Sequence, residues 1–432
     1  MKLVELFCGC GGFSRGAHAA GFEVAAAYDI DPILTSSYPT NFPNTALYHQ
    51  DVGELTGAEI ERHIGEKVFG VFGGPPCQGF SEIGKRNPED PRRELLGHFF
   101  RIVAQLEPAF FAMENVRGLA YAGAKPVLDA ALRAVEDDYD LLGPVVWDAS
   151  KFGAATKRQR MFVIGIRKDR RSPLTAADIA ARHATAATVA DAISDIAQAE
   201  LVEPCESSLS IDRWQLPAGT ALSEYAASMR APGGTFTGHL PTVHTDAVVA
   251  RFAAVGPGEY DKVGRHPRLD PEGQCPTLRA GTGSEKGSFQ SVRPIHPSLD
   301  RVITVREAAR LQGFPDVHVF HPTIWHSFRM IGNSVSPIMA KVVFDAIRDR
   351  LGLVLDREGR VTLPSPSPFN VVKARFRRHK PKTNKLTTKR RLVSGRSVDD
   401  GTPVLVDVSR AREGYQARDA GSPRRSRFGA AV

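Results

Sequence analysis

The chain has 432 residues, of which 42% are hydrophobic and 24% are charged, so we expect a folded protein of two or three domains. We find no apolar run that approaches the roughly 18 residues of a membrane span, which argues against an integral membrane protein. Glu5 interrupts the first apolar run, so we expect no signal peptide. Five cysteines are too few for a secreted disulfide framework, and we therefore expect a reducing, cytoplasmic setting.

The basic charge of the chain is concentrated near its C-terminal end. The net charge is +8, but 17 lysines and arginines against five acidic residues follow residue 360, so this segment carries +12 and residues 1–360 carry −4. Residues 364–368 read Pro-Ser-Pro-Ser-Pro, and residues 371–396 contain eleven basic residues and no acidic one. We expect residues 360–432 to form a disordered basic tail, either solvated or adding affinity for phosphates.

Short apolar strands alternate with helices through the first 170 residues. We expect strands at 3–8, 22–28, 68–72, 109–113 and 161–166, and helices at 13–20, 98–106 and 127–135. This alternation predicts an α/β fold with a mainly parallel sheet. In such sheets ligands bind beyond the carboxyl ends of the strands.

The pattern changes from about residue 173. Ala-rich helical stretches at 174–199 give way to loops rich in Gly, Pro and Thr at 205–300, and helices are expected at 305–312 and 335–351. A second, irregular domain is therefore expected.

A glycine-rich turn, Phe-Cys-Gly-Cys-Gly-Gly at residues 7–12, follows the first strand. Such a turn at a helix N-terminus lets the backbone approach a nucleotide-like ligand closely, whether a dinucleotide or S-adenosylmethionine, but it is also an ordinary strand-to-helix connection. Asp29, after the second strand, is either a ribose acceptor or a helix cap, and Asp51 has the same ambiguity. Cys8 and Cys10 have no second ligand pair, so we predict no metal site.

Three further groups of residues could carry chemistry. Residues 73–81 read Gly-Gly-Pro-Pro-Cys-Gln-Gly-Phe-Ser, and this stiff turn presents Cys77 either as a nucleophile or as a small buried side chain. Glu114 ends an apolar strand, where a carboxyl group can donate a proton or cap the structure. Arg158 and Arg160 share one face of a strand and could hold a phosphate or a base carbonyl, or be merely solvated.

Six motifs, in this order, resemble those of the DNA (cytosine-5)-methyltransferase family over residues 3–350. They lie at residues 7–12, 74–78, 114–116, 158–160, 306–315 and 332–335. The resemblance implies a Rossmann-like S-adenosylmethionine-dependent methyltransferase domain at 1–172 and 326–353, and a target-recognition domain at 173–325. It also implies methylation of carbon 5 of cytosine in a specific duplex DNA sequence, with attack of a cysteine on carbon 6 of a flipped-out base.

The resemblance also implies roles for individual residues. The catalytic residues would be Cys77, Glu114, Arg158 and Arg160. The S-adenosylmethionine site would comprise Phe7, Gly9, Gly11, Asp29, Ile30, Asp51, Val52, Pro75, Asn333 and Ser334. Residues 79–97 are similar to the family's catalytic loop, and the DNA contacts would be Gln78, Ser81, Lys85, Arg92 and Thr277.

The sequence departs from the family pattern at two places. Many members have Pro-Gln where this chain has Ala155-Thr156, and we expect altered local packing there. The acidic residue after the second strand is often Glu and here is Asp29, and the neighbouring position, often a large residue that stacks on adenine, is Ile30. We expect Asp29 to reach a ribose and the thinner Ile30 to weaken cofactor binding.

Other functions compete with this one. An RNA-directed member of the superfamily is one, although the Cys-Phe-Thr signature of tRNA-directed relatives is absent from the sequence. A catalytically silent DNA-binding relative is another, against which the intact Cys77 and Glu114 argue. A nicotinamide dehydrogenase would use the glycine turn, but that function does not explain the Pro-Pro-Cys motif. We expect a monomer that binds double-stranded DNA, with a restriction endonuclease acting on the same site as a candidate partner.

Overall fold

The computed structural model describes residues 1–76, 94–121, 124–170, 173–203, 211–280 and 293–363. The predictions for the basic tail and for Cys77, Gln78, Ser81, Lys85 and Arg92 lie outside these residues and stay predictions.

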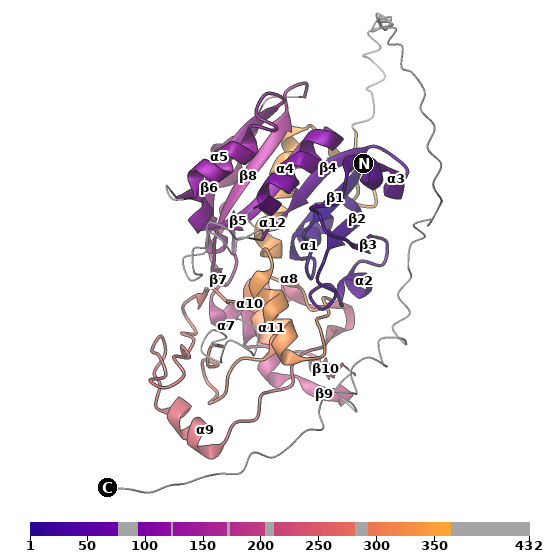
Figure 1. Ribbon diagram of the computed structural model, residues 1–432. Helices are drawn as coiled ribbons and strands as arrows, with labels where there is room; N and C mark the ends of the chain where they lie inside the picture. Colours follow the sequence, from indigo (N-terminus) through magenta and orange to yellow (C-terminus); the bar gives the residue numbers. More distant parts are fainter. Residues whose placement is uncertain (77–93, 122–123, 171–172, 204–210, 281–292, 364–432) are drawn as a thin grey trace, which may run out of the picture. The chain divides into compact units, whose positions relative to one another are not determined.

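A seven-stranded sheet forms the centre of the first part of the chain (Figure 1). Its order is β3 (Ala46–His49), β2 (Glu23–Asp29), β1 (Lys2–Leu6), β4 (Val68–Gly73), β5 (Phe110–Val116), β8 (Gln159–Arg167) and β6 (Tyr139–Asp148). The first five strands are parallel, whereas β8 runs antiparallel to both β5 and β6. The predicted α/β fold with a mainly parallel sheet is confirmed.

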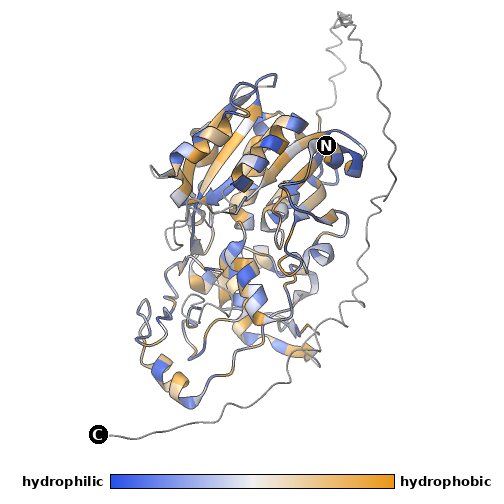
Figure 2. Cartoon of the chain, in the orientation of Figure 1, coloured by the Kyte–Doolittle hydropathy of each residue, from blue (hydrophilic) through white to orange (hydrophobic). Residues whose placement is uncertain are grey.

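Helices cover both faces of this sheet because its strands are apolar on both sides. On β5, Phe110 and Ala112 pack in the core that includes α1 (Gly12–Ala19) and α12 (Pro337–Arg350). Phe111 and Met113 point the other way, into the core below α3, α4 and α5. These three helices span Gly57–Ile64, Glu94–Leu106 and Lys125–Leu132. Figure 2 shows hydrophobic residues concentrated along the central strands, with hydrophilic residues on the outer sides of the helices.

Helices α1 and α12 cross closely although more than 300 residues separate them in the sequence. A Cβ added to Gly16 would overlap Ala340, so the absent side chain permits this approach. Phe13 on α1 packs against Phe72 with ring centroids 5.0 Å apart and against Phe344 at 5.5 Å. The last long helix thus completes the core that the first strand and helix begin.

The remaining described elements are short. Residues 173–333 contain α6 (Ala176–Ala180), α7 (Val189–Ile193), β9 (Glu200–Glu203), β10 (Arg213–Gln215), α8 (Glu224–Met229), β11 (Thr235–Phe236), α9 (Asp246–Ala253), β12 (Cys275–Pro276), α10 (Val305–Gln312) and α11 (Ile324–Asn333). Outside this range are α2 (Tyr38–Asn41), β7 (Thr156–Lys157), β13 (Val354–Leu355) and β14 (Val361–Thr362). One core cluster joins α7, α10 and α11, and the predicted boundary at residue 325 falls within α11. The domain limits stay a prediction.

Helix α10 has the termini that the sequence predicts. Thr304 and Glu307 form a capping box at its start, and Gly313 ends it with a left-handed φ of +94°. Its Arg310 is fully buried, with Nε 2.6 Å from Asp316 Oδ1 and Nη1 3.2 Å from Asp195 Oδ1. These ion pairs hold α10 in the interior.

One segment, Ile324–Arg350, has the length and hydropathy of a membrane span, which the sequence reading did not identify. It comprises two helices, α11 and α12, separated at residues 334–336, and 67% of its most apolar window is buried inside the protein. We interpret these helices as core elements.

Candidate active site

The glycine-rich turn between β1 and α1 has an unusual backbone. Phe7, Gly9 and Gly11 have φ values of +59°, +49° and +81°, and a non-glycine residue such as Phe7 seldom adopts this left-handed conformation. A Cβ on Gly11 would lie 2.8 Å from the Tyr38 ring, and one on Gly12 would overlap the Ser334 hydroxyl. The turn therefore packs tightly against two distant segments, one of which follows α11.

Asp29 lies at the end of β2, directly beside this turn. Its Oδ2 accepts a hydrogen bond from the Gly9 backbone N–H at 2.8 Å, and its Oδ1 accepts one from Asp31 N–H at 2.9 Å. Burial raises the pKa of Asp29, and these hydrogen bonds oppose the rise. The next side chain, Ile30, is 66% exposed, an unusual position for a large aliphatic residue. A fixed carboxylate beside an exposed apolar side chain suits a nucleoside, with its polar ribose and flat base.

Asp51 and Val52 lie in a loop that a buttressing arginine holds. Arg101 on α4 donates to the carbonyl oxygens of Val52 at 3.0 Å and Leu55 at 2.8 Å. The Asp51 carboxylate accepts from Gly53 N–H at 2.8 Å, and the Val52 side chain is buried. The contact of Arg101 with this loop was not predicted, because a helical sequence pattern does not indicate which arginine contacts a distant segment.

Glu114, near the end of β5, meets Arg160 on the neighbouring strand β8. Arg160 Nε lies 2.9 Å from Glu114 Oε1, and both side chains are largely buried. Burial raises the pKa of Glu114, while the positive charges of Arg160 and Arg158 lower it. A buried carboxyl group whose pKa is raised by burial and lowered by nearby arginines can exchange a proton or hydrogen bonds with a bound base.

The turn that leads to Cys77 lies beside this pair. A Cβ on Gly74 would be 3.2 Å from Glu114 Oε2, so glycine leaves room next to the carboxylate. Asn115 Nδ2 donates to the Pro75 carbonyl at 3.0 Å. Two predicted motifs that are 40 residues apart are therefore adjacent, although Cys77 itself lies outside the described residues.

Arg158 differs from Arg160 in its surroundings. Its side chain is fully buried and donates to the carbonyl oxygens of Leu278 at 3.2 Å, Gly332 at 2.9 Å and Ser334 at 2.6 Å. A guanidinium enclosed in this way has no exposed surface for a phosphate, which was one of the sequence-based readings. Arg158 instead joins three segments of the site.

Thr277 lies in the segment that follows β12, which pairs with β7 in parallel. Its exposed hydroxyl donates to the Lys157 carbonyl at 2.6 Å, so it has a partner within the protein. Thr156, one of the positions where the sequence departs from the expected family pattern, is buried and donates to the Cys275 carbonyl at 3.0 Å. The altered local packing expected at residue 156 stays a prediction.

Asn333 is exposed at the end of α11, and Ser334 follows it. The Ser334 carbonyl also accepts from Gln312 Nε2 at 3.1 Å, and Arg158 binds the same oxygen. Gly12 lies against Ser334. The predicted cofactor residues Gly11 and Ser334, which are far apart in the sequence, therefore lie close together in the fold.

A buried carboxyl group below the glycine turn was not predicted. Glu5 on β1 accepts hydrogen bonds from Ser14 and, at 3.3 Å, from Tyr38. Burial, the largest cause, raises its pKa to about 8. The signal in the sequence was a lone acidic residue inside an apolar strand.

The cysteines within the described part of the chain, Cys8, Cys10 and Cys275, are buried, and burial raises the pKa of each thiol. Such thiols are poor nucleophiles. Among the described residues, no group of three or more His, Cys, Asp or Glu side chains could hold a metal ion.

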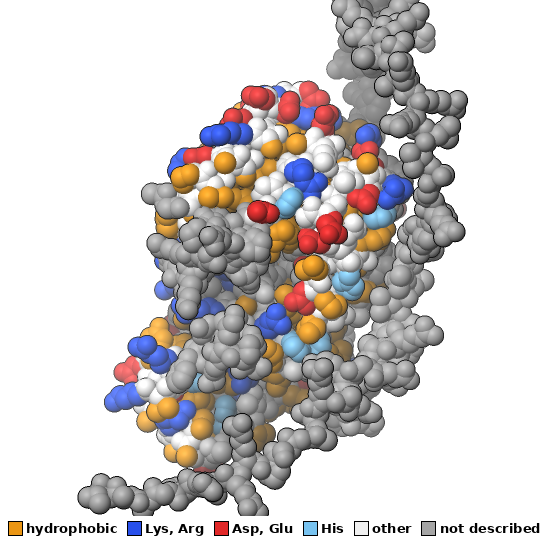
Figure 3. Space-filling view, viewed as in Figure 1, with side chains coloured by type: hydrophobic (Ala, Val, Ile, Leu, Met, Phe, Trp, Pro, Cys, Tyr) orange, Lys and Arg blue, Asp and Glu red, His pale blue; other side chains and the backbone are white. Residues whose placement is uncertain are grey.

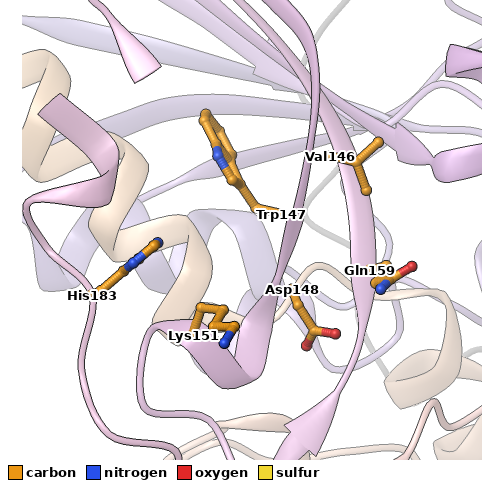
Figure 4. Close-up of a pocket in the computed structure, with 6 residues that line it drawn as sticks. All are labelled: Val146, Trp147, Asp148, Lys151, Gln159 and His183. Carbon is orange, nitrogen blue, oxygen red and sulfur yellow. The ribbon is translucent and has the colours of Figure 1, made fainter. Parts of the chain in front are cut away.

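A pocket of about 290 Å³ lies at the edge of the sheet (Figure 4). Its lining comes from β6, β8, the short 3-10 helix η3 (Ala149–Lys151) and a neighbouring loop, and includes none of the predicted site residues. It comprises Val146, Trp147, Asp148, Lys151, Gln159 and His183.

Charged side chains differ between the two ends of β6 and β8. Exposed charges of both signs lie at the end remote from Arg160, where Glu136, Asp137, Asp138 and Asp169 stand beside Lys168 and Arg170. Figure 3 shows acidic and basic side chains interspersed along that edge. At the Arg160 end, the exposed side chains of the described residues include the basic Arg117, Lys151, Lys157 and Arg279. These basic side chains favour approach of a polyanion to the end that carries Glu114 and Arg160.

Solved structures share the fold. The chain is 34% identical to a candidate DNA modification methyltransferase encoded within an E. coli prophage, with a TM-score of 0.67 over 82% of this chain and 99% of that one. S. pombe Dnmt2 methyltransferase shares the fold, with 20% identity and a TM-score of 0.54 over 82% of this chain and 98% of that one.

Sequence comparisons agree. The chain is 40% identical to the type II methyltransferase M.XorII of Xanthomonas oryzae over 79% of this chain and 82% of the relative. It is 30% identical to M.DdeI of Desulfomicrobium norvegicum over 80% of this chain and 88% of the relative. The profile of the C-5 cytosine-specific DNA methylases matches residues 1–349. The family expected from the six motifs is confirmed: the chain belongs to the C-5 cytosine-specific DNA methylases.

Proposed function

We propose that the chain transfers a methyl group from S-adenosylmethionine to carbon 5 of cytosine within a specific duplex DNA sequence, by attack of Cys77 on carbon 6 of a flipped-out base. Membership of the family makes it a DNA (cytosine-5)-methyltransferase. The observation that carries the finer proposal is the Glu114–Arg160 pair beside the Gly74–Pro75 turn.

Cytosine requires activation because carbon 5 is a poor nucleophile. Attack of the Cys77 thiolate on carbon 6 would break the aromatic system and move electron density to carbon 5. Glu114 would hydrogen-bond N3 and the exocyclic amine, and Arg160 would donate to O2, so that both stabilise the developing charge. After methylation, transfer of the carbon 5 proton to water would break the bond between carbon 6 and the Cys77 sulfur, release the thiolate and restore the aromatic ring.

Arg158 acts in this proposal as a positioning residue. Its guanidinium holds the carbonyl oxygens of Leu278 and Ser334, so it orients the strand that carries Arg160 without touching the base. This replaces the phosphate contact considered from the sequence.

S-adenosylmethionine supplies a methyl group activated by a positive sulfonium. The residues present suit its adenosine part, since Asp29 offers a fixed acceptor for ribose hydroxyls and Ile30 an exposed apolar surface for adenine. Phe7, Gly9 and Gly11 would approach the ligand with their backbone. Asp51, Val52, Pro75, Asn333 and Ser334 complete the site in the proposal.

DNA would approach the basic end of β6 and β8. The target base lies inside the duplex, so it must be flipped out at a cost of a few kcal/mol. Gln78, Ser81, Lys85, Arg92 and Thr277 are proposed DNA contacts on the sequence alone, with residues 173–325 as the recognition domain. The type II relatives suggest a restriction-modification setting with an endonuclease partner.

Nucleoside mass spectrometry tests the reaction. Purified protein and its Cys77→Ala variant would be incubated with S-adenosylmethionine and either unmethylated duplex DNA of mixed sequence or transfer RNA. We expect 5-methylcytosine in DNA with the wild-type protein and none with Cys77→Ala. Product only in RNA would refute the DNA proposal, and product that persists in Cys77→Ala would refute the nucleophile.

A further inference from the structure

An ion pair joins two segments that carry proposed cofactor residues. Arg329 Nη2 on α11 lies 3.5 Å from Asp31 Oδ2, in the loop after β2. The side chains are 26% and 31% exposed, respectively, so solvent only partly screens the pair. No motif identified in the sequence contains Asp31 or Arg329.

Asp31 is fixed on its own side by three hydrogen bonds. Its Oδ1 accepts from Ile33 N–H at 2.9 Å and Leu34 N–H at 3.0 Å, which orders the loop. Its backbone N–H donates to Asp29 Oδ1 at 2.9 Å. Because Asp29 also binds Gly9, the hydrogen bonds run without a break from the glycine turn to Asp31.

Arg329 extends this chain of contacts from Asp31 to helix α11. It lies four residues before Asn333, which is about one turn of α11. The pair therefore links the loop with Asp29 and Ile30 to the helix that ends at Asn333. His326, one turn closer to the start of α11, also faces both charges, and burial lowers its pKa.

We propose that Arg329 is a positioning residue for S-adenosylmethionine, because its ion pair with Asp31 fixes the spacing between the Asp29–Ile30 loop and the end of α11. This inference rests on the proposed cofactor site. Arg329 acts through the loop and needs no contact with the ligand. Its loss should weaken cofactor binding and leave the chemical step unaffected.

Isothermal titration with S-adenosylmethionine tests the proposal on the full chain. Arg329→Met keeps the aliphatic stem and removes the charge, and Asp31→Asn keeps the Oδ1 acceptor for Ile33 and Leu34. We expect Kd to rise about two- to fivefold in each variant, as for a partly exposed ion pair. Since the two residues act as one unit, the double variant should lose no more than either single one. Arg329→Lys should recover part of the affinity.

A matched control distinguishes this from a general loss of surface charge. Lys125→Met removes a more exposed ion pair, between Lys125 and Asp129 at 2.7 Å on α5, and should leave Kd unchanged. For Arg329→Met, KM for S-adenosylmethionine should rise while kcat at saturation stays the same. An unchanged Kd in Arg329→Met, or losses that multiply in the double variant, would overturn the inference alone. A wild-type protein that does not bind S-adenosylmethionine would overturn the cofactor assignment and the inference with it.

Discussion

The guanidinium of Arg158 donates to the carbonyl oxygen of Ser334 at 2.6 Å, so a strand of the sheet is bound directly to the residue that follows α11. The same side chain holds Leu278, which follows the pairing of β12 with β7. A single buried cation thus joins the proposed base site, cofactor site and recognition segment.

We predict that Arg158→Met destabilises the protein by about 3 kcal/mol, because the carbonyl oxygens of Leu278 and Gly332 lose this donor and only that of Ser334 keeps a second one, from Gln312. Urea denaturation measures this loss. Arg158→Lys retains the charge but cannot reach all three carbonyls, so its stability should lie between those of the methionine variant and the wild type. Wild-type stability in Arg158→Met would show that the three contacts contribute little.

A second prediction concerns the pH dependence of methyl transfer. Burial raises the pKa of Glu114 and Arg160 lowers it, so Arg160→Met should raise this pKa further. If protonated Glu114 donates to N3 of cytosine, activity falls as pH rises through this pKa. The alkaline limb of kcat against pH should therefore move to higher pH in Arg160→Met, while kcat itself falls about 100-fold with the loss of the O2 donor.

Glu114→Gln provides the control for this profile, because an amide does not titrate. Its residual activity should lack the limb. A limb at the same pH in the wild type and in Arg160→Met would assign it to another group.

A third prediction concerns Glu5, whose pKa is raised from 4.5 to about 8 by burial. In the unfolded chain the carboxyl group loses its proton near pH 4.5, whereas the folded protein retains it up to about pH 8. Stability should therefore fall as pH rises through this window. Glu5→Gln removes the effect, so urea denaturation at pH 5, 6.5 and 8 should show the variant gaining on the wild type. Parallel stability curves would contradict the raised pKa.

Much of the fold can be predicted from the sequence, because local features such as helix caps and apolar runs agree with the packing of the folded chain. The helix expected at 305–312 spans the same residues in the structure, since Thr304 and Gly313 mark its ends. Strand β6 was missed because Gly143 and Pro144 interrupt its apolar pattern. The antiparallel direction of β8 was also not predicted, since an apolar strand carries no mark of its orientation.

The candidate site was likewise predicted only in part. Motifs place Glu114 and Arg160 in the chain, but their 2.9 Å contact depends on the register of β5 with β8. Arg158 has the same sequence pattern as Arg160, yet it is enclosed by Leu278 and Ser334, which are more than 100 residues away. Whether an arginine can contact a substrate or only supports the fold depends on whether distant segments bury it. A local sequence pattern does not show this burial.

The crossing of α1 and α12 has a consequence for biosynthesis. Phe13, Phe22, Phe72 and Phe110 all lie against Phe344. A ribosome that has made the entire sheet has therefore not yet supplied the residue that covers these four rings. The nascent chain keeps an apolar face open until α12 emerges from the exit tunnel, and the glycine turn and Ser334 meet only after most of the chain has been translated.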